Sequence, residues 1–266
     1  MSFTLHTGSL PLLISMPHIG TAIPADLQAH FVPRALDTED TDWHLARLYD
    51  FAAALGASVL QAQFSRYVID LNRPPDDAPM YPGASNTELC PTRFFTGEAL
   101  YRAGHAPDAP ERARRRSAYW EPYHQALQGE LQRLLRVHGY ALLWDAHSIR
   151  SEIPWLFEGV LPALNIGTAS GASADASITR ALADVCASHP QTSHVVNGRF
   201  KGGYITRHYG APANRVHAVQ LEMCQNLYMQ ETPPYAYEPA LAQRIQPQLR
   251  AMLQAALHAC EVLYAT

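Results

Sequence analysis

The sequence predicts an α/β domain with helices on both faces of a central sheet. Short apolar runs alternate along the chain with longer segments of helical periodicity. Two apolar runs end abruptly in histidine, and a third ends in glutamate. No internal repeat or linker divides the 266 residues. We therefore expect a single domain over residues 1–266, built on a mixed, mostly parallel sheet.

The first half of the chain contains three predicted strands and one predicted helix. Apolar or β-branched side chains predict strands at 10–15, 57–61 and 66–71. Helical spacing predicts a helix over 40–55, capped by Asp37 or Thr38, with an acidic first turn at 39–42. Residues 73–110 are rich in Pro, Gly, Asp and Asn and are predicted to be irregular, so that 74–110 is a candidate lid.

The second half alternates helices and strands. Periodicity predicts helices over 111–138, 178–187 and 241–257, the first of them kinked or divided at Pro122. Apolar runs predict strands at 141–145 and 217–222. Between them, 197–210 is predicted to be a polar, Gly-rich loop. This order is typical of βαβ units, in which strands run parallel.

Composition excludes several classes of protein. Hydrophobic residues make up 47% of the chain and charged residues 17%, which indicates a globular protein. The net charge of −4 argues against nucleic acid as a partner, so we interpret the arginine run at 112–116 as a solvated helix face rather than an interaction surface. With no evident signal peptide or membrane span, and no CxxC pair among four cysteines, we expect a cytoplasmic protein with reduced thiols.

Polar side chains at three predicted strand ends suggest a metal site. His18 and His147 each follow an apolar run, and Glu222 closes another. In open α/β sheets, ligands bind beyond the carboxyl ends of strands. The acidic turn at 39–42 offers a further carboxylate. Two imidazoles and one carboxylate form a typical catalytic zinc set, and a separate carboxylate can act as general base. Asp145 lies two positions before His147 and shares its face of the strand.

Arginines near these strand ends suit an acidic substrate. Arg73 follows the predicted strand 66–71 beside Asn72, and Arg199 and Arg207 lie in the Gly-rich loop. A guanidinium can hold a carboxylate through two hydrogen bonds. The chain has no GxSxG, P-loop, GxGxxG or HExxH motif. We interpret four other histidines as surface residues: His105, His124, His138 and His189.

Several segments together resemble the N-formylglutamate amidohydrolase family of histidine degradation. They occur in family order and span most of the chain: Ser15–Gly20, Asp40–His44, Leu48–Asp50, Ser65–Pro74, Asp145–Ser148 and Asn197–Arg207. The resemblance implies a carboxypeptidase-like (phosphorylase/hydrolase-like) zinc enzyme that cleaves N-formyl-L-glutamate to formate and L-glutamate. It implies one Zn²⁺, or another divalent ion, and a small dicarboxylate amide as substrate, with no nucleic acid or membrane partner.

The resemblance also implies roles for individual residues. His18, Asp42 and His147 become the metal ligands, although Asp40 and His44 remain alternatives to Asp42. Glu222 becomes the general base, Arg66 a catalytic residue at the oxyanion, and Asp145 a support for His147. The substrate would be bound by the following residues: Asn72, Arg73, Arg199, Tyr204 and Arg207. Two alternatives stay open: a related zinc enzyme for another N-acyl amino acid or small amide, and a non-catalytic carboxylate-binding protein. The oligomeric state also stays open.

Overall fold

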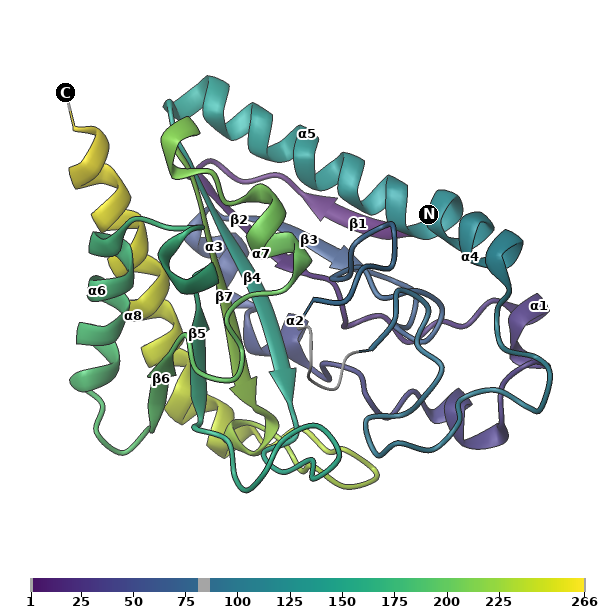
Figure 1. Cartoon of the computed structure of the whole chain (residues 1–266). Coiled ribbons are helices and arrows are strands. Elements are labelled where there is room, and N and C mark those ends of the chain that lie inside the picture. The colour runs from purple at the N-terminus through teal and green to yellow at the C-terminus, as the bar shows by residue number, and fades with distance from the viewer. Residues whose placement is uncertain (1, 81–86, 266) are drawn as a thin grey trace.

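A central sheet organises the part of the chain that this computed structural model describes, residues 2–80 and 87–265 (Figure 1). Its strand order is β1-β3-β2-β4-β7-β5-β6. The strands are β1 (Phe3–His6), β2 (Leu12–Met16), β3 (Ser58–Ala62), β4 (Ala141–Ile149), β5 (Leu164–Gly167), β6 (His194–Val196) and β7 (Val216–Cys224). The central strands β3, β2, β4 and β7 run parallel, whereas β1 and β5 are antiparallel to their inner neighbours. The predicted mixed, mostly parallel sheet is confirmed.

Helices cover both faces of the sheet, as predicted. One face packs against α2 (Leu45–Leu48), α3 (Phe51–Leu55), α6 (Ala176–Ala187) and α8 (Pro239–Tyr264). The other packs against α5 (Glu121–His138) and α7 (Tyr204–Tyr209). Side chains alternate between the two cores along each strand, so Leu12 and Ile14 join the first and Leu13 the second. The short helices α1 (Ala25–Gln28) and α4 (Ala109–Arg115) lie at the edge, and 3-10 turns occupy Pro33–Asp37, Ala169–Gly171, Pro212–Asn214 and Gln225–Leu227.

The register of β4 and β7 places polar side chains on the α5 side of the sheet. Strand β4 continues to Ile149, four residues beyond the predicted end, so Asp145 and His147 both lie within it. They share a face with Leu143, which packs in the α5 core. Glu222 is the direct neighbour of His147 on β7. This face of the sheet therefore presents an imidazole and a carboxylate next to each other.

The predicted strand at 66–71 is wrong. These residues form turns and irregular chain, although Tyr67, Val68 and Ile69 are buried. Their backbone groups bond locally, as in Val68 N–H to Ser65 O, rather than to a strand. The apolar run therefore reflects burial in the α5 core and not pairing in the sheet.

The predicted helix at 40–55 begins later and is divided. Thr38 and His44 have positive φ angles of 48° and 61°, which interrupt a right-handed helix. Helices α2 and α3 follow, separated at Tyr49 and Asp50. The acidic residues at 39–42 therefore lie on an irregular segment and not in a first helical turn.

The predicted helix at 111–138 begins earlier and contains a wider turn. It runs from α4 through a π-helical turn, Arg116–Trp120, into α5, and Pro122 is the second residue after this turn. The predicted loop at 197–210 contains α7. The short strands β1, β5 and β6 were not predicted, because runs of three or four residues carry too little periodicity.

Two further expectations concern the whole chain. All four cysteines are free and buried. Within residues 2–80 and 87–265, no helix is both long and apolar enough to cross a membrane. Part of the candidate lid, residues 81–86, lies outside the described residues, and lid closure stays a prediction.

Candidate active site

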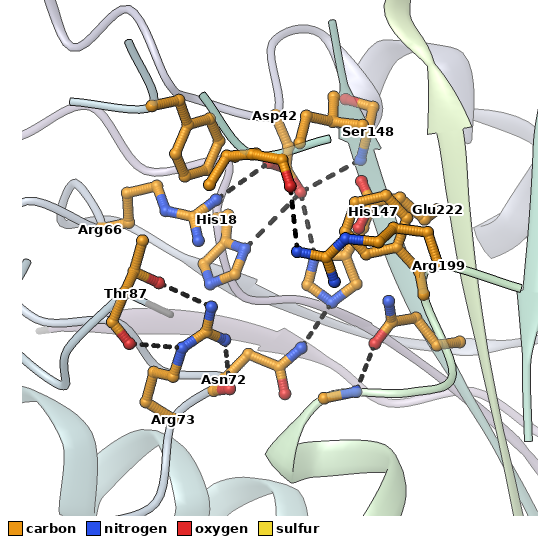
Figure 2. A pocket seen from close by; sticks show the side chains of 16 residues that line it. His18, Asp42, Arg66, Asn72, Arg73, Thr87, His147, Ser148, Arg199 and Glu222 are labelled. Carbon is orange, nitrogen blue, oxygen red and sulfur yellow. Dashed lines mark hydrogen bonds and ion pairs between the residues drawn. The ribbon is translucent and has the colours of Figure 1, made fainter. Parts of the chain in front are cut away.

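A cavity lies at the carboxyl-terminal parts of β2, β4 and β7, on the α5 side of the sheet (Figure 2). Histidine, carboxylate and arginine side chains from distant parts of the chain meet there. Its lining residues are His18, Asp42, Arg66, Asn72, Arg73, Thr87, Phe95, His147, Ser148, Ile149, Leu156, Arg199, Phe200, Gly203, Gln220 and Glu222. The three predicted strand-end residues, His18, His147 and Glu222, therefore share one site.

His18, Asp42 and His147 form a buried group that could hold a metal ion. Oδ2 of Asp42 lies 3.1 Å from Nδ1 of His147 and 3.8 Å from Nδ1 of His18. The candidate ligand atoms all lie within 4.8 Å of one another. Ligands at ~2.0–2.2 Å from a tetrahedral zinc ion are themselves separated by roughly 3.3 Å. The spacing and the donor types thus fit such an ion.

Asp42, rather than Asp40 or His44, belongs to this group. Asp40 accepts hydrogen bonds from Tyr67 and from the backbone of Phe95, and it pairs with Arg150 at 2.9 Å. Nε2 of His44 lies 2.7 Å from the carbonyl oxygen of Tyr235. Both alternatives are therefore engaged elsewhere in the described structure.

A carboxylate contacts Nε2 of each of the two histidines, the ring nitrogen that does not face Asp42. Nε2 of His18 lies 2.6 Å from Oδ1 of Asp70, and Nε2 of His147 lies 3.0 Å from Oδ2 of Asp145. Such contacts fix the ring and leave Nδ1 to face an ion. Sequence reasoning missed Asp70. The sequence signal that could have identified Asp70 is that it is a single charged residue inside an apolar run, directly before Leu71.

The charge around His147 favours a cation. Burial would lower the pKa of His147, but Asp145 and Asp42 raise it well above its ordinary value. A protonated imidazole is then held between two carboxylates when no ion is bound. A metal ion at Nδ1 must displace that proton, so its affinity falls as the solution becomes acidic.

Glu222 lies in the same cavity and is only 8% exposed. Burial raises the pKa of its carboxyl to about 8, and the nearby Asp42 contributes to this rise while His147 opposes it. A carboxyl group whose pKa lies near neutral pH can both accept and return a proton. Perturbed groups of this kind cluster at functional sites.

Arg66 and Arg73 border the cavity on the side opposite β7 (Figure 2). Arg66 pairs with Asp70 at 2.6 Å, and its guanidinium lies over the ring of Phe95. Arg73 donates three hydrogen bonds: Nε to Thr87 O, Nη2 to Thr87 Oγ1 and Nη1 to Asn72 O. One N–H on each terminal nitrogen of Arg73 remains for a ligand.

Asn72 is held from two sides. Its Oδ1 accepts the backbone N–H of Ile205 at 2.8 Å. This orients Nδ2, which lies 3.1 Å from Asp145 and 3.0 Å from His147. A Cβ at Gly203 would lie 2.4 Å from Nδ2 of Asn72, so only glycine permits this approach. Because Nε2 of His147 donates to Asp145, the amide of Asn72 also donates to Asp145 and supports His147 through that carboxylate.

The Gly-rich loop reaches the cavity through Arg199 and Gly203, and Gly203 N–H donates to Gln220. Arg199 donates to the carbonyl of Leu156 at 3.3 Å. Among the described residues that line the cavity, neither Tyr204 nor Arg207 occurs. Tyr204 packs instead against Trp120 and His124, and Nε of Arg207 donates to Gly202 O.

Two interpretations of surface residues are wrong. His124 is 4% exposed and Arg115 is fully buried, whereas His105 is exposed as predicted. Both buried side chains donate hydrogen bonds to backbone carbonyls of the 66–73 segment. Helical periodicity did not reveal them, because they face a loop and not a strand or helix.

Comparisons with known proteins place the chain among proteins of one family. Residues 10–229 match the family model described as N-formylglutamate amidohydrolase. The chain is 54% identical to an N-formylglutamate deformylase of Pseudomonas putida over 254 residues, covering 96% of this chain and 95% of that protein. It is also 54% identical to an N-formylglutamate deformylase of Pseudomonas aeruginosa over 250 residues, covering 94% of each.

Two solved structures share the fold. The crystal structure of N-formylglutamate amidohydrolase from Ralstonia eutropha superposes with a TM-score of 0.80 at 24% identity, covering 98% of this chain and 97% of that one. A gene product from Agrobacterium tumefaciens superposes with a TM-score of 0.75 at 18% identity, covering 98% and 96%.

Fold and cavity define an α/β enzyme with a buried group that could bind a metal ion. The chain belongs to the N-formylglutamate amidohydrolase family. The expectation of an enzyme that hydrolyses an amide bond is confirmed.

Proposed function

We propose that this chain hydrolyses N-formyl-L-glutamate to formate and L-glutamate, with one Zn²⁺ held by His18, Asp42 and His147. The observation that carries the proposal is the convergence of these three buried side chains beside Glu222 in one cavity. Two relatives, each 54% identical, are named N-formylglutamate deformylase, which supports the substrate. A cytoplasmic location and a place in histidine degradation remain predictions.

The donor set supports zinc as the ion. Two imidazole nitrogens and one carboxylate oxygen leave a position open, as catalytic zinc sites do. When bound, such an ion polarises a carbonyl group and lowers the pKa of water to about 7. Asp70 and Asp145 would keep both Nδ1 atoms directed at it.

Glu222 would move the proton. In the proposed reaction it accepts a proton from the attacking water as the water oxygen bonds to the formyl carbon. It then returns this proton to the amide nitrogen as the carbon–nitrogen bond breaks. Arg66 borders the same cavity and would stabilise negative charge on the formyl oxygen.

Arginines would bind the two carboxylates of the substrate. Arg73 keeps one N–H on each terminal nitrogen for a ligand, and Arg199 borders the cavity. Guanidinium–carboxylate pairs are strong and directional in a partly buried site. Asn72 lines the same cavity beside them and would contribute to substrate binding; its carbonyl oxygen also accepts from Arg73, and its amide donates to Asp145, the partner of His147.

The test is formate release from three amides, with and without a metal chelator. We expect N-formyl-L-glutamate to be hydrolysed faster than N-formyl-L-aspartate or N-acetyl-L-glutamate, and chelation to abolish the activity until zinc is restored. Preference for the acetyl substrate, followed as release of acetate, would support a related deacylase instead. Bound zinc with no hydrolysis of any of the three would support a carboxylate-binding protein.

A further inference from the structure

The 66–73 segment carries four side chains of the cavity or of its support, yet it lies in neither a helix nor a strand. These side chains are Arg66, Asp70, Asn72 and Arg73. Irregular backbone that is buried must find hydrogen-bond partners outside a ladder, or it costs free energy. The donors that satisfy its carbonyl oxygens therefore determine where these side chains lie.

Three donors come from one continuous helical run, α4 through α5. Each is a side-chain N–H that reaches a different carbonyl oxygen of the segment. The contacts are Arg115 Nη1 to Val68 O at 3.1 Å, His124 Nε2 to Leu71 O at 2.9 Å and Trp120 Nε1 to Arg73 O at 3.1 Å. One helical element thus supports the segment at three carbonyl oxygens, whereas Tyr101 and the backbone N–H of Tyr204 donate to those of Tyr67 and Asn72.

The π-helical turn makes this alignment possible. Arg115 and Trp120 are five residues apart, which in an α-helix separates side chains by about 140° around the axis. In the turn Arg116–Trp120 the N–H of Glu121 instead bonds to the carbonyl of Arg116, five residues earlier. A turn of this width brings residues five apart onto one face, and such turns are frequent at functional sites.

Trp120 and His124 also stabilise each other. Their rings stack with centroids 3.7 Å apart. A carbonyl oxygen only accepts hydrogen bonds, so Nε2 of His124 is protonated and donates a hydrogen bond to Leu71 O. Nδ1 then accepts the hydroxyl of Tyr209 at 2.9 Å. The stack and the Tyr209 contact therefore hold the two rings in addition to their bonds to the segment.

We propose that Trp120 and His124 are positioning residues for the reaction, acting through the carbonyls of Arg73 and Leu71. Trp120 sets the place of Arg73 in the cavity. His124 sets the place of Leu71, which lies between Asp70, the partner of His18, and Asn72, which donates to Asp145, the partner of His147. Small displacements of groups that bind substrate or metal weaken binding and catalysis strongly. Only this expected effect on the kinetics rests on the proposed function.

The test compares Trp120→Phe with Tyr123→Phe. Trp120→Phe removes the indole N–H that donates a hydrogen bond to Arg73 O, and it keeps an aromatic ring over His124. The second removes a buried hydroxyl from the same helix that contacts Ser15 of β2 and not the segment. We expect hydrogen–deuterium exchange of peptides covering 66–73 to rise about tenfold in Trp120→Phe only. We also expect its KM for N-formyl-L-glutamate to rise about fivefold, with a smaller change in kcat.

The exchange measurement does not depend on activity. If the wild-type chain releases no formate, the proposed function fails while exchange still tests the positioning. Equal exchange in the two variants overturns the inference, and so does faster exchange in Trp120→Phe with an unchanged KM. His124→Phe provides a second variant that keeps the stack: we expect about tenfold weaker zinc binding in chelator competition. Zinc binding as tight as in the wild type would refute the role of His124.

Discussion

His18 and Asp70 form a buried pair, with Nε2 and Oδ1 2.6 Å apart. Burial opposes ionisation of Asp70, but His18 and Arg66 hold its pKa well below the usual range. The carboxylate therefore stays charged and fixes the imidazole, so that Nδ1 faces Asp42. The pair links the predicted metal ligand to the 66–73 segment.

Replacing Asp70 with asparagine should weaken zinc binding. The new amide would keep the size of the side chain but lose the charge that orients His18, and partners of this kind typically contribute about 10- to 100-fold in metal affinity. The measurement is competition with a chromogenic chelator near neutral pH. Asp26→Asn, which changes an exposed surface ion pair with Arg114, serves as the control and should bind zinc like the wild type. Unchanged affinity in Asp70→Asn would show that the pair does not orient the ligand.

Glu222→Gln should retain zinc and lose turnover. The amide cannot accept a proton, so we expect kcat to fall by about 10²- to 10⁴-fold. In the wild type, kcat/KM should rise with pH as Glu222 ionises; burial raises its pKa to about 8 in the chain without an ion, and a bound cation lowers it from there. The residual activity of the variant should lack this rise. A variant with wild-type kcat would remove Glu222 as the base.

The sequence could predict the site residues that lie near the carboxyl ends of strands. An apolar run that stops at a histidine or glutamate marks a buried strand and a side chain near its carboxyl end, as for His147 in β4 and Glu222 in β7, each two residues before the last residue of its strand. The segment at 66–71 has the same apolar character but lies outside the sheet, because burial alone does not distinguish a loop from a strand. The role of Trp120 as a donor was not predictable, since it depends on tertiary contact and on a π-helical turn.

Arg73→Ala should raise KM far more for N-formyl-L-glutamate than for formamide, which has no carboxylate. A hydrogen-bonded charge contributes about 1.5–3 kcal/mol, which corresponds to roughly 10- to 100-fold in KM. The KM of Arg73→Lys for N-formyl-L-glutamate should lie between those of the wild type and Arg73→Ala, because lysine keeps the charge but loses the planar guanidinium. Since Arg73 also bonds to Thr87, thermal unfolding should be measured in parallel. An equal rise in KM for both substrates would contradict the proposed carboxylate contact.

His124 should make the fold sensitive to mild acid. Burial lowers the pKa of His124 to about 3, and the carbonyl of Leu71 opposes this shift only in part. Its ordinary value is about 6.5, so below that pH the unfolded chain binds a proton that the folded chain excludes. The stability contributed by neutral His124 is therefore complete above pH ~6.5 and is lost as the pH falls towards 3; between pH ~7 and ~5 the loss is about 2 kcal/mol.

Urea unfolding at several pH values tests this dependence. His124→Gln cannot titrate but can still donate to Leu71 O, so its free energy of unfolding should fall by about 2 kcal/mol less than that of the wild type over the same interval. His105→Gln, at an exposed position, should follow the wild type. A wild-type pH dependence in His124→Gln would mean that His124 gains its proton without unfolding. The hydrogen bond from Tyr209 to Nδ1 could not then persist in the acidified fold.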